Sequence, residues 1–324
     1  EPENTPAGIA RSLGRGVIGF SDAFEKLQPD IVVLLGDRFE MLAAAGAATS
    51  MLIPIAHIHG GEITEGAIDN AFRHAITKMA HFHFVAAPAY RDRVIQMGEA
   101  PDHVYVVGAP GLDNLERLKI PNRDQLFERL EIDPSRQVFL VTYHPATLDE
   151  KNPIEALEEL LAALDEFPDV SVIITKANAD AGGRAINDRL ESYATSCSGR
   201  VHFATTLGQV NYLGALMAAD VIIGNSSSGI IEAPASGTPT VNLGIRQAGR
   251  LRAGSIIDCD EKKEAIVTAI NKALSTDFMA EAGNKEPPYG RSSGASEKIT
   301  KILGEVELDG ILIKSFYNLG SHGR

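Results

Sequence analysis

Five ionisable side chains lie at the ends of two apolar runs in the first third of the chain. They are Asp37, His57, His59, Glu62 and Glu65. The runs, at residues 31–36 and 54–59, are separated by an alanine-rich segment, and this alternation predicts two parallel strands joined by a helix. Ligands of open α/β sheets bind beyond the carboxyl ends of the strands. Carboxylates and imidazoles placed there could take up and return protons.

The acidic residues of this region also have plain structural explanations. Asp37 directly precedes a helical segment, where it could serve as the N-cap. Asp69 and Arg73 lie four residues apart on the helix predicted at residues 67–80, and therefore share a face. They could form an exposed ion pair of little value to stability, or the guanidinium could keep the Asp69 carboxylate ionised and ready to accept a proton. The sequence leaves both interpretations open.

A second polar cluster lies in the other half of the chain. The segment GNSSSG (224–229) follows an apolar run and precedes a helical turn. Its small residues would let backbone N–H groups approach a phosphate at the helix N-terminus, with hydroxyls from Ser226 and Ser227 and a ribose acceptor in Glu232. A serine-rich helix cap would look the same. His144 ends another predicted strand, where it could either stabilise a phosphate or serve the fold alone.

The elements that must position these groups alternate between strand and helix, twice over. This pattern predicts an α/β fold with two doubly wound, Rossmann-like parallel-sheet domains that face a cleft. We assign residues 1–118 to the first domain, 119–290 to the second, and 291–324 to a C-terminal helix and tail that pack back on the first. The first domain shows four strands, at 31–36, 54–59, 81–87 and 104–109, and it opens on a helix. Because such a domain usually begins with a strand, we expect the chain to start inside the domain.

Composition excludes several classes of function. The formal charge of −13 argues against nucleic acid or an anionic membrane as a partner. No apolar run is long enough for a transmembrane helix, and no signal peptide is visible. Two distant cysteines, Cys197 and Cys259, are typical of a reducing cytoplasm. No metal-binding spacing and no GxGxxG motif occur, so we expect neither a metal nor another cofactor.

Five motifs together carry a resemblance to a known family. They are GDRFE (36–40), HIHGGEITEGAIDNAFRHAITK (57–78), YHPAT (143–147), GNSSSGIIEAP (224–234) and GTPTVNLGIRQAGR (237–250). Over residues 5–303 the chain resembles the UDP-N-acetylglucosamine 2-epimerases, above all the hydrolysing branch of sialic-acid and legionaminic-acid synthesis. The resemblance implies a glycosyltransferase-B-like architecture with the nucleotide in the second domain. It also implies a cytoplasmic homo-dimer or tetramer whose partner is a UDP-sugar.

The resemblance further implies a reaction and roles for single residues. UDP would leave C1 as the C2 proton is removed, and water would then add, giving a free 2-acetamido mannose-type sugar. The residues that match the family's catalytic and binding positions are Asp37, Asp69, Arg73 and His144, and, for UDP, Asn178, Ser226, Ser227, Glu232 and Arg246.

The chain departs from the family at one catalytic position and at its beginning. Many relatives have Glu where His59 stands, so the third acid is one of Glu62, Glu65 and His59, and we favour Glu62. The family's substrate-binding arginine loop would precede the first residue of this chain.

Four other functions stay open. Two are enzymes of the same family, a hydrolysing UDP-N,N'-diacetylbacillosamine 2-epimerase and a non-hydrolysing UDP-N-acetylglucosamine 2-epimerase. The other two are a glycosyltransferase of similar fold and a UDP-sugar-binding protein without catalysis.

Overall fold

The computed structural model describes residues 5–149, 151–178, 180, 182–283, 286–292 and 294–320. The chain divides into two compact units. Unit 1 comprises residues 1–64, 68–113 and 293–324, and unit 2 comprises residues 65–67 and 114–292. The short segment 65–67 is grouped with unit 2 because its backbone bonds there: Glu65 N donates to Ala248 O at 3.0 Å, and Gly66 O accepts from Leu148 N at 3.2 Å.

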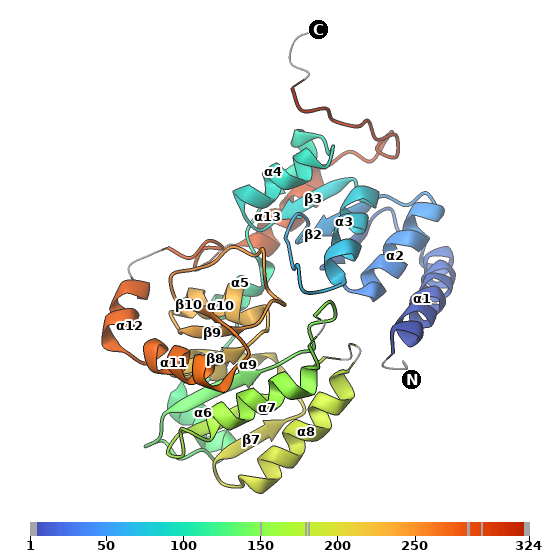
Figure 1. The fold of residues 1–324 in the computed structure, drawn as a ribbon. Helices are drawn as coiled ribbons and strands as arrows, with labels where there is room; N and C mark the ends of the chain where they lie inside the picture. The colour runs from blue at the N-terminus through green and yellow to red at the C-terminus, as the bar shows by residue number, and fades with distance from the viewer. Residues whose placement is uncertain are drawn as a thin grey trace. The chain divides into compact units, whose positions relative to one another are not determined.

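Unit 1 contains a four-stranded parallel sheet in the order β1-β2-β3-β4 (Figure 1). The strands are β1 (Val32–Leu35), β2 (Ile55–Ile58), β3 (Phe82–Val85) and β4 (Val104–Val106). In this register Leu35 pairs with Ile58, so β1 and β2 end side by side. The residues that follow them, Asp37 and His59, therefore start from the same edge of the sheet.

The helices of unit 1 are α1 (Pro6–Leu27), α2 (Phe39–Ser50), α3 (Asp69–Met79), α4 (Pro88–Gln96), the 3₁₀ helix η1 (Pro101–His103), α5 (Pro110–Arg117) and α13 (Ala295–Glu305). The division between the two units falls within α5, after Asp113. Small residues bring α1 and α2 close together. A Cβ added at Gly16 would lie 2.9 Å from the Ala43 side chain. Five alanines of α2 are buried, and all of them except Ala43 belong to one hydrophobic core.

The C-terminal segment completes unit 1. At the start of α13, the backbone N–H groups of Ala295 and Ser296 donate to the carboxylate of Asp113, at 3.0 and 2.7 Å, which places a negative charge at a helix N-terminus. Ala295 and Ile299 then pack in the core with residues of β2 and β3.

The tail that follows α13 is also held in unit 1. Lys314 Nζ donates to the carbonyl oxygens of Lys78 and Ala80, at 2.7 Å each, and lies 2.8 Å from the Glu99 carboxylate. Tyr317 N donates to Gly98 O at 2.8 Å. Residues more than 200 positions apart thus share one unit.

Unit 2 contains a six-stranded parallel sheet in the order β10-β9-β8-β5-β6-β7. Its strands are β5 (Val138–Thr142), β6 (Ser171–Thr175), β7 (Val201–Ala204), β8 (Val221–Gly224), β9 (Thr240–Leu243) and β10 (Ile256–Cys259). The central strands β5 and β8 are buried throughout, as expected where helices cover both faces. The helices are α6 (Arg123–Leu130), α7 (Pro153–Leu164), α8 (Gly183–Ser196), α9 (Gly208–Ala218), α10 (Ser228–Ser236), α11 (Lys263–Ala273) and α12 (Thr276–Gly283).

The two parallel sheets confirm the predicted fold class of two Rossmann-like α/β domains. Two α-helices and the short 3₁₀ helix η1 were not predicted. Helix α5 starts at Pro110 within the sequence GAPG, which suggests a loop, but proline fits the first turn of a helix because its φ is already helical. Helix α12 is short and follows α11 after a brief break. None of the described helices has both the length and the apolar character that crossing a membrane requires.

Candidate functional site

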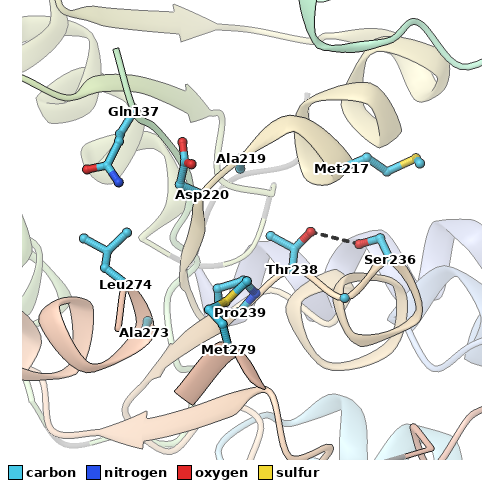
Figure 2. A pocket seen from close by; sticks show the side chains of 11 residues that line it. Gln137, Met217, Ala219, Asp220, Ser236, Thr238, Pro239, Ala273, Leu274 and Met279 are labelled. Atoms are coloured by element: carbon cyan, nitrogen blue, oxygen red, sulfur yellow. Dashed lines mark hydrogen bonds between the residues drawn. The ribbon is translucent and has the colours of Figure 1, made fainter. Parts of the chain in front are cut away.

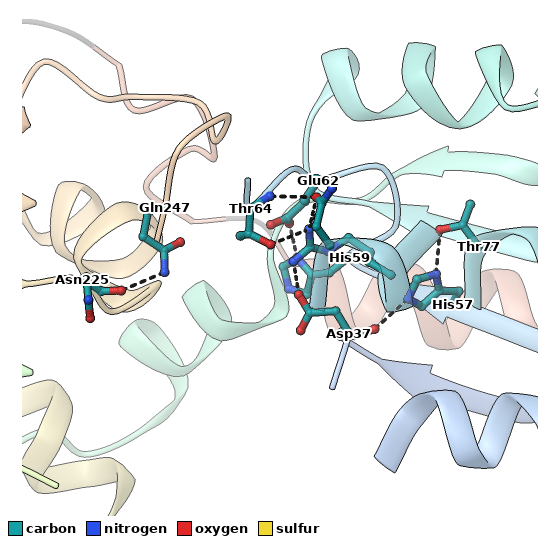
Figure 3. Close-up of polar contacts among 11 residues, drawn as sticks. Asp37, His57, His59, Glu62, Thr64, Thr77, Asn225 and Gln247 are labelled. Carbon is teal, nitrogen blue, oxygen red and sulfur yellow. Dashed lines mark hydrogen bonds and ion pairs between the residues drawn. The ribbon is translucent and has the colours of Figure 1, made fainter. Parts of the chain in front are cut away.

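In unit 1, Asp37 and Arg73 form an ion pair at the edge where the strands end (Figure 3). The Arg73 side chain is 1% exposed, whereas that of Asp37 is 22% exposed. Asp37 is not the cap of α2, because Arg38 occupies the N-cap position and no side chain caps that helix. The capping explanation of Asp37 is therefore wrong, and its carboxylate is available to balance the buried guanidinium.

Arg73 also fixes the loop after β2. Its Nη1 donates to the backbone oxygen of Glu62 at 3.0 Å and to Thr64 Oγ1 at 3.2 Å. The Asn70 side chain in turn accepts the backbone N–H of Thr64 at 2.9 Å. One buried cation on α3 thus connects the end of β1 with the loop that follows β2.

His57 supports the same edge from inside the sheet. It is fully buried; its Nε2 donates to Gly36 O at 2.8 Å, and its Nδ1 accepts from the Thr77 hydroxyl at 3.1 Å. Burial lowers the pKa of His57 to about 3. The ring is therefore neutral and holds the residue before Asp37 in place. Within unit 1, His57 is a positioning residue.

His59 and Glu62 form a second polar pair at this edge. His59 Nδ1 lies 2.6 Å from Glu62 Oε1, and the Glu62 side chain is 1% exposed. His59 has φ of 67°, a left-handed conformation that costs a non-glycine residue roughly 1 kcal/mol. Its backbone N–H donates to Phe84 O at 3.0 Å, which anchors this conformation to the end of β3.

The other acidic candidates lie near this group in the sequence. Asp69 begins α3 and is half-buried, and a carboxylate in the first turn is stabilised by the helix dipole. The within-helix spacing of Asp69 and Arg73 does not predict the ion pair of Arg73 with Asp37, a residue on another element. Glu65 is exposed and belongs to unit 2.

In unit 2, Asn225 organises the edge where β5 and β8 end. It is fully buried, and its side chain accepts from His144 N and donates to His144 O, at 2.8 Å in both cases. The preceding Gly224 has φ of 137°, and a Cβ there would lie 2.0 Å from Thr142 O. Only glycine allows this approach, so the serine loop leaves the sheet in a fixed direction.

Arg246 and Gln247 secure the loop from a third direction. Arg246 Nη1 donates to Asn225 O at 2.9 Å. Gln247 Nε2 donates to the same oxygen, also at 2.9 Å (Figure 3). Asn225 was not among the predicted site residues, although it lies inside the GNSSSG motif. The sequence could not predict this role, because the Asn225 side chain bonds to the backbone of His144, a residue distant in the chain.

His144 and Asn178 meet at the ends of β5 and β6. Asn178 N donates to His144 Nδ1 at 3.1 Å, and Asn178 Nδ2 donates to Asp180 Oδ2 at 2.6 Å. Because Nδ1 accepts a backbone N–H, the ring hydrogen lies on Nε2. His144 can thus offer a hydrogen bond from Nε2 while it remains neutral.

The serine loop leads into α10. Ser226 Oγ lies 3.0 Å from Ser228 Oγ, and the Tyr212 hydroxyl bonds to Ser228 as well. Ser227 is the N-cap residue, and its own side chain makes no capping hydrogen bond. The Ser226 hydroxyl instead accepts from the backbone N–H of Ser228, the first residue of α10, at 3.4 Å. The capping interpretation of the serines therefore stays open. Glu232, half-buried, lies one turn into the helix.

A cavity of about 280 Å³ in unit 2 lies elsewhere (Figure 2). Its lining includes Ala219 and Asp220, just before β8, and Thr238 and Pro239, just before β9. It thus lies at the amino ends of these strands, opposite the serine loop. Among the described residues, no group of three or more His, Cys, Asp or Glu side chains is arranged to hold a metal.

Comparisons with known proteins agree with these motifs. The family model for UDP-N-acetylglucosamine 2-epimerase matches residues 3–304. The chain belongs to the UDP-N-acetylglucosamine 2-epimerase family. The predicted family is thereby confirmed.

Individual relatives are similar along most of the chain. It is 40% identical to the GDP/UDP-N,N'-diacetylbacillosamine 2-epimerase (hydrolyzing) of Campylobacter jejuni, over 96% of this chain and 80% of the relative. It is 39% identical to the UDP-N,N'-diacetylbacillosamine 2-epimerase (hydrolyzing) of Legionella pneumophila, over 83% of this chain and 70% of the relative. The crystal structure of UDP-GlcNAc 2-epimerase from Neisseria meningitidis bound to UDP-GlcNAc covers 94% of this chain and 84% of that one, with a TM-score of 0.79 and 20% identity, and so shows the shared fold.

Proposed function

We propose that the chain is a hydrolysing 2-epimerase of a UDP-2-acetamido sugar. The observation that carries the proposal is the convergence of the Asp37–Arg73 pair and the His59–Glu62 pair at one sheet edge. The family and its hydrolysing relatives give the reaction class. The products would be UDP and a free 2-acetamido sugar of manno configuration.

The chemistry requires what these residues offer. The C2 hydrogen is not acidic, so departure of UDP from C1 must lead as a base removes that hydrogen. Charge then develops on C1 and on the leaving phosphate, and fixed groups stabilise it best. In this scheme Asp37, Asp69 and the His59–Glu62 pair of unit 1 handle protons and positive charge, while Arg73 holds Asp37 and the Glu62 backbone in place.

Unit 2 would bind the nucleotide. Ser226 and Ser227, at the N-terminus of α10, would bind the pyrophosphate, and Glu232 would accept hydrogen bonds from the ribose. His144 would donate its Nε2 hydrogen to the leaving phosphate. Asn178 would support that histidine, and Arg246 would support the loop and the phosphate charge.

We infer a sugar with a second acetamido group at C4. Two relatives of about 40% identity bear the name of the diacetylbacillosamine enzyme, whereas the Neisseria meningitidis serogroup B UDP-N-acetylglucosamine 2-epimerase is 32% identical. The product would serve the synthesis of legionaminic-acid or sialic-acid-type sugars. We propose a cytoplasmic enzyme that works as a homo-dimer or tetramer.

The test is a product assay with two substrates. The purified chain is incubated separately with UDP-N-acetylglucosamine and with UDP-N,N'-diacetylbacillosamine, and products are identified by proton NMR in D₂O. We expect UDP and free manno-configured sugar in equal amounts, with one deuterium at C2, and faster turnover of the diacetylated substrate. Intact UDP-ManNAc as the sole product would assign the non-hydrolysing reaction. UDP binding by calorimetry without any product would leave only a binding role.

A further inference from the structure

The conformation at the end of β2 fixes an imidazole at the sheet edge. His59 is held in the left-handed region by its backbone bond to Phe84 O, and its side chain is 17% exposed. Nδ1 donates to the Glu62 carboxylate at 2.6 Å, while none of the described residues forms a hydrogen bond with Nε2. The ring therefore presents Nε2 as the nitrogen that a substrate could meet.

Glu62 is better suited to orient this ring than to reach a substrate. Its side chain is 1% exposed, and its backbone oxygen accepts from Arg73 at 3.0 Å. A buried carboxylate that accepts the Nδ1 hydrogen selects the tautomer and stabilises positive charge on the imidazole. With Nδ1 held by Glu62, the ring directs Nε2 away from that carboxylate, where an Nε2–H could be donated.

Asp37 has the opposite surroundings. Its ion pair with the buried guanidinium of Arg73 stabilises the carboxylate, which is a proton acceptor. Arg73 also contacts the backbone of Glu62, so the acceptor and the donor belong to one connected group (Figure 3). Inversion at C2 requires a proton to leave one face and another to arrive on the opposite face. A carboxylate that accepts a proton and an imidazole that donates one could together meet that requirement.

On the basis of the proposed function, we propose that His59 is the catalytic acid that returns a proton to C2, and that Glu62 is its positioning residue. First, Asp37 takes the C2 hydrogen, the C2–H electrons form the C1=C2 double bond, and the C1–O electrons leave with UDP. Next, Nε2–H of His59 protonates C2 with the π electrons, and water bonds to C1. The water then gives one proton to the neutral imidazole, and Asp37 releases its proton to solvent.

The test separates the two half-reactions. In His59→Gly the imidazole is absent, and glycine adopts the observed φ without strain. With the substrate that the wild-type chain turns over faster, this variant should still release UDP together with an unsaturated sugar, seen by its vinylic C1 proton in NMR. Formation of the saturated sugar should fall by about 10²–10⁴-fold. Added imidazole should restore it in part.

Three variants serve as controls. Asp37→Asn should release neither UDP nor unsaturated sugar, and imidazole should not rescue it. Glu62→Gln should lower kcat with little change in KM. His103→Gln, a half-buried histidine of η1, should behave like the wild-type chain.

Two results would overturn the role of His59. One is saturated sugar formed by His59→Gly within about three-fold of the wild-type rate. The other is simultaneous loss of UDP release and sugar formation in both His59→Gly and His59→Asn, with unchanged circular dichroism and Tm. Absence of hydrolysis by the wild-type chain on either substrate would instead remove the proposed function, and this role with it.

Discussion

Arg73 shows how a single buried cation can organise chemistry at the residue scale. Its planar fork donates to Asp37, after β1, and to the Glu62 backbone and Thr64, both in the loop after β2. Such charge-assisted bonds are stronger than neutral ones and fix geometry as well as charge. In the proposed mechanism, Asp37 is therefore both a reactive group and an ion-pair partner of Arg73.

Replacement of Asp37 by Asn tests this double role. The amide cannot accept a proton, so turnover should fall by about 10²–10⁴-fold. It also removes the ion pair between this carboxylate and the buried Arg73 guanidinium, which should lower the free energy of unfolding by about 1–3 kcal/mol. UDP affinity should hardly change, since unit 2 binds the nucleotide in our proposal. Turnover assays, urea unfolding and calorimetry with UDP measure the three effects; normal turnover would exclude Asp37 from the mechanism.

Glu232 is the residue of unit 2 whose role is easiest to isolate. Loss of a charged acceptor for the ribose hydroxyls in Glu232→Ala should weaken UDP binding by about 10–100-fold, equivalent to roughly 1.5–3 kcal/mol. Isothermal titration calorimetry measures the affinity of the variant for UDP. Glu191→Ala, an exposed carboxylate on α8, is the matched control. Equal affinity in the two variants would contradict the ribose contact.

At the element scale, the tail after α13 stabilises unit 1 through a buried cluster. Burial raises the pKa of Glu99, but hydrogen bonds from His83, Lys314 and Lys78 outweigh it and bring the pKa to about 2. Lys314 also satisfies two backbone carbonyls, those of Lys78 and Ala80. The tail therefore supplies one of the cations that neutralise a carboxylate inside unit 1.

Substitution of Lys314 by Met should destabilise unit 1. It leaves Glu99 with two of its three side-chain donors and removes both carbonyl contacts, so the free energy of unfolding should drop by about 1–3 kcal/mol. Urea denaturation followed by circular dichroism measures this. Lys301→Met, an exposed lysine on α13, should change stability by less than about 0.5 kcal/mol. Equal stability of both variants would show that the tail contacts add nothing.

The elements were more predictable from sequence than the contacts between them. Alternating apolar runs and helical segments have strong local periodicity, so the strands and most helices were predicted within a few residues. Helix α5 was missed because glycine and proline near Pro110 resemble a loop. The pairing of Asp37 with Arg73 depends on sheet register and helix packing, which no local pattern encodes. Likewise, the contact of His57 with Gly36 joins residues 21 positions apart.

At the scale of the whole molecule, buried histidines make unit 1 sensitive to acid. Burial lowers the pKa of His57 to about 3 and of His81 to about 4, and it also lowers that of His83. The folded state therefore binds fewer protons than the unfolded one. The stability that these rings confer is complete above their unfolded pKa of about 6.5 and is lost as the pH falls toward their folded values.

As the pH falls from 7 to 5, the protonation equilibria of His57 and of His81 should each lower the free energy of unfolding of unit 1 by about 2 kcal/mol. In unit 2, burial also lowers the pKa of the half-buried His202. Hydrogen exchange measured by mass spectrometry should therefore show protection lost first in peptides from β2 and β3 and later in those from β5 and β8. His57→Gln, which cannot titrate, should reduce the loss in unit 1. Simultaneous loss in both units would contradict this order.

The discontinuity of unit 1 has a consequence for its biosynthesis. Asp113 and Gly98 receive their partners from residues 295–317, which leave the ribosome only after all of unit 2 has been made. At about 5–20 residues per second, roughly 10–40 s separate translation of Asp113 from that of Ala295. During this interval the core face around Phe82 and Phe84 lacks Ala295 and Ile299. Nascent chains of this protein should therefore need protection by chaperones at that face, while unit 2 can complete its sheet before synthesis ends.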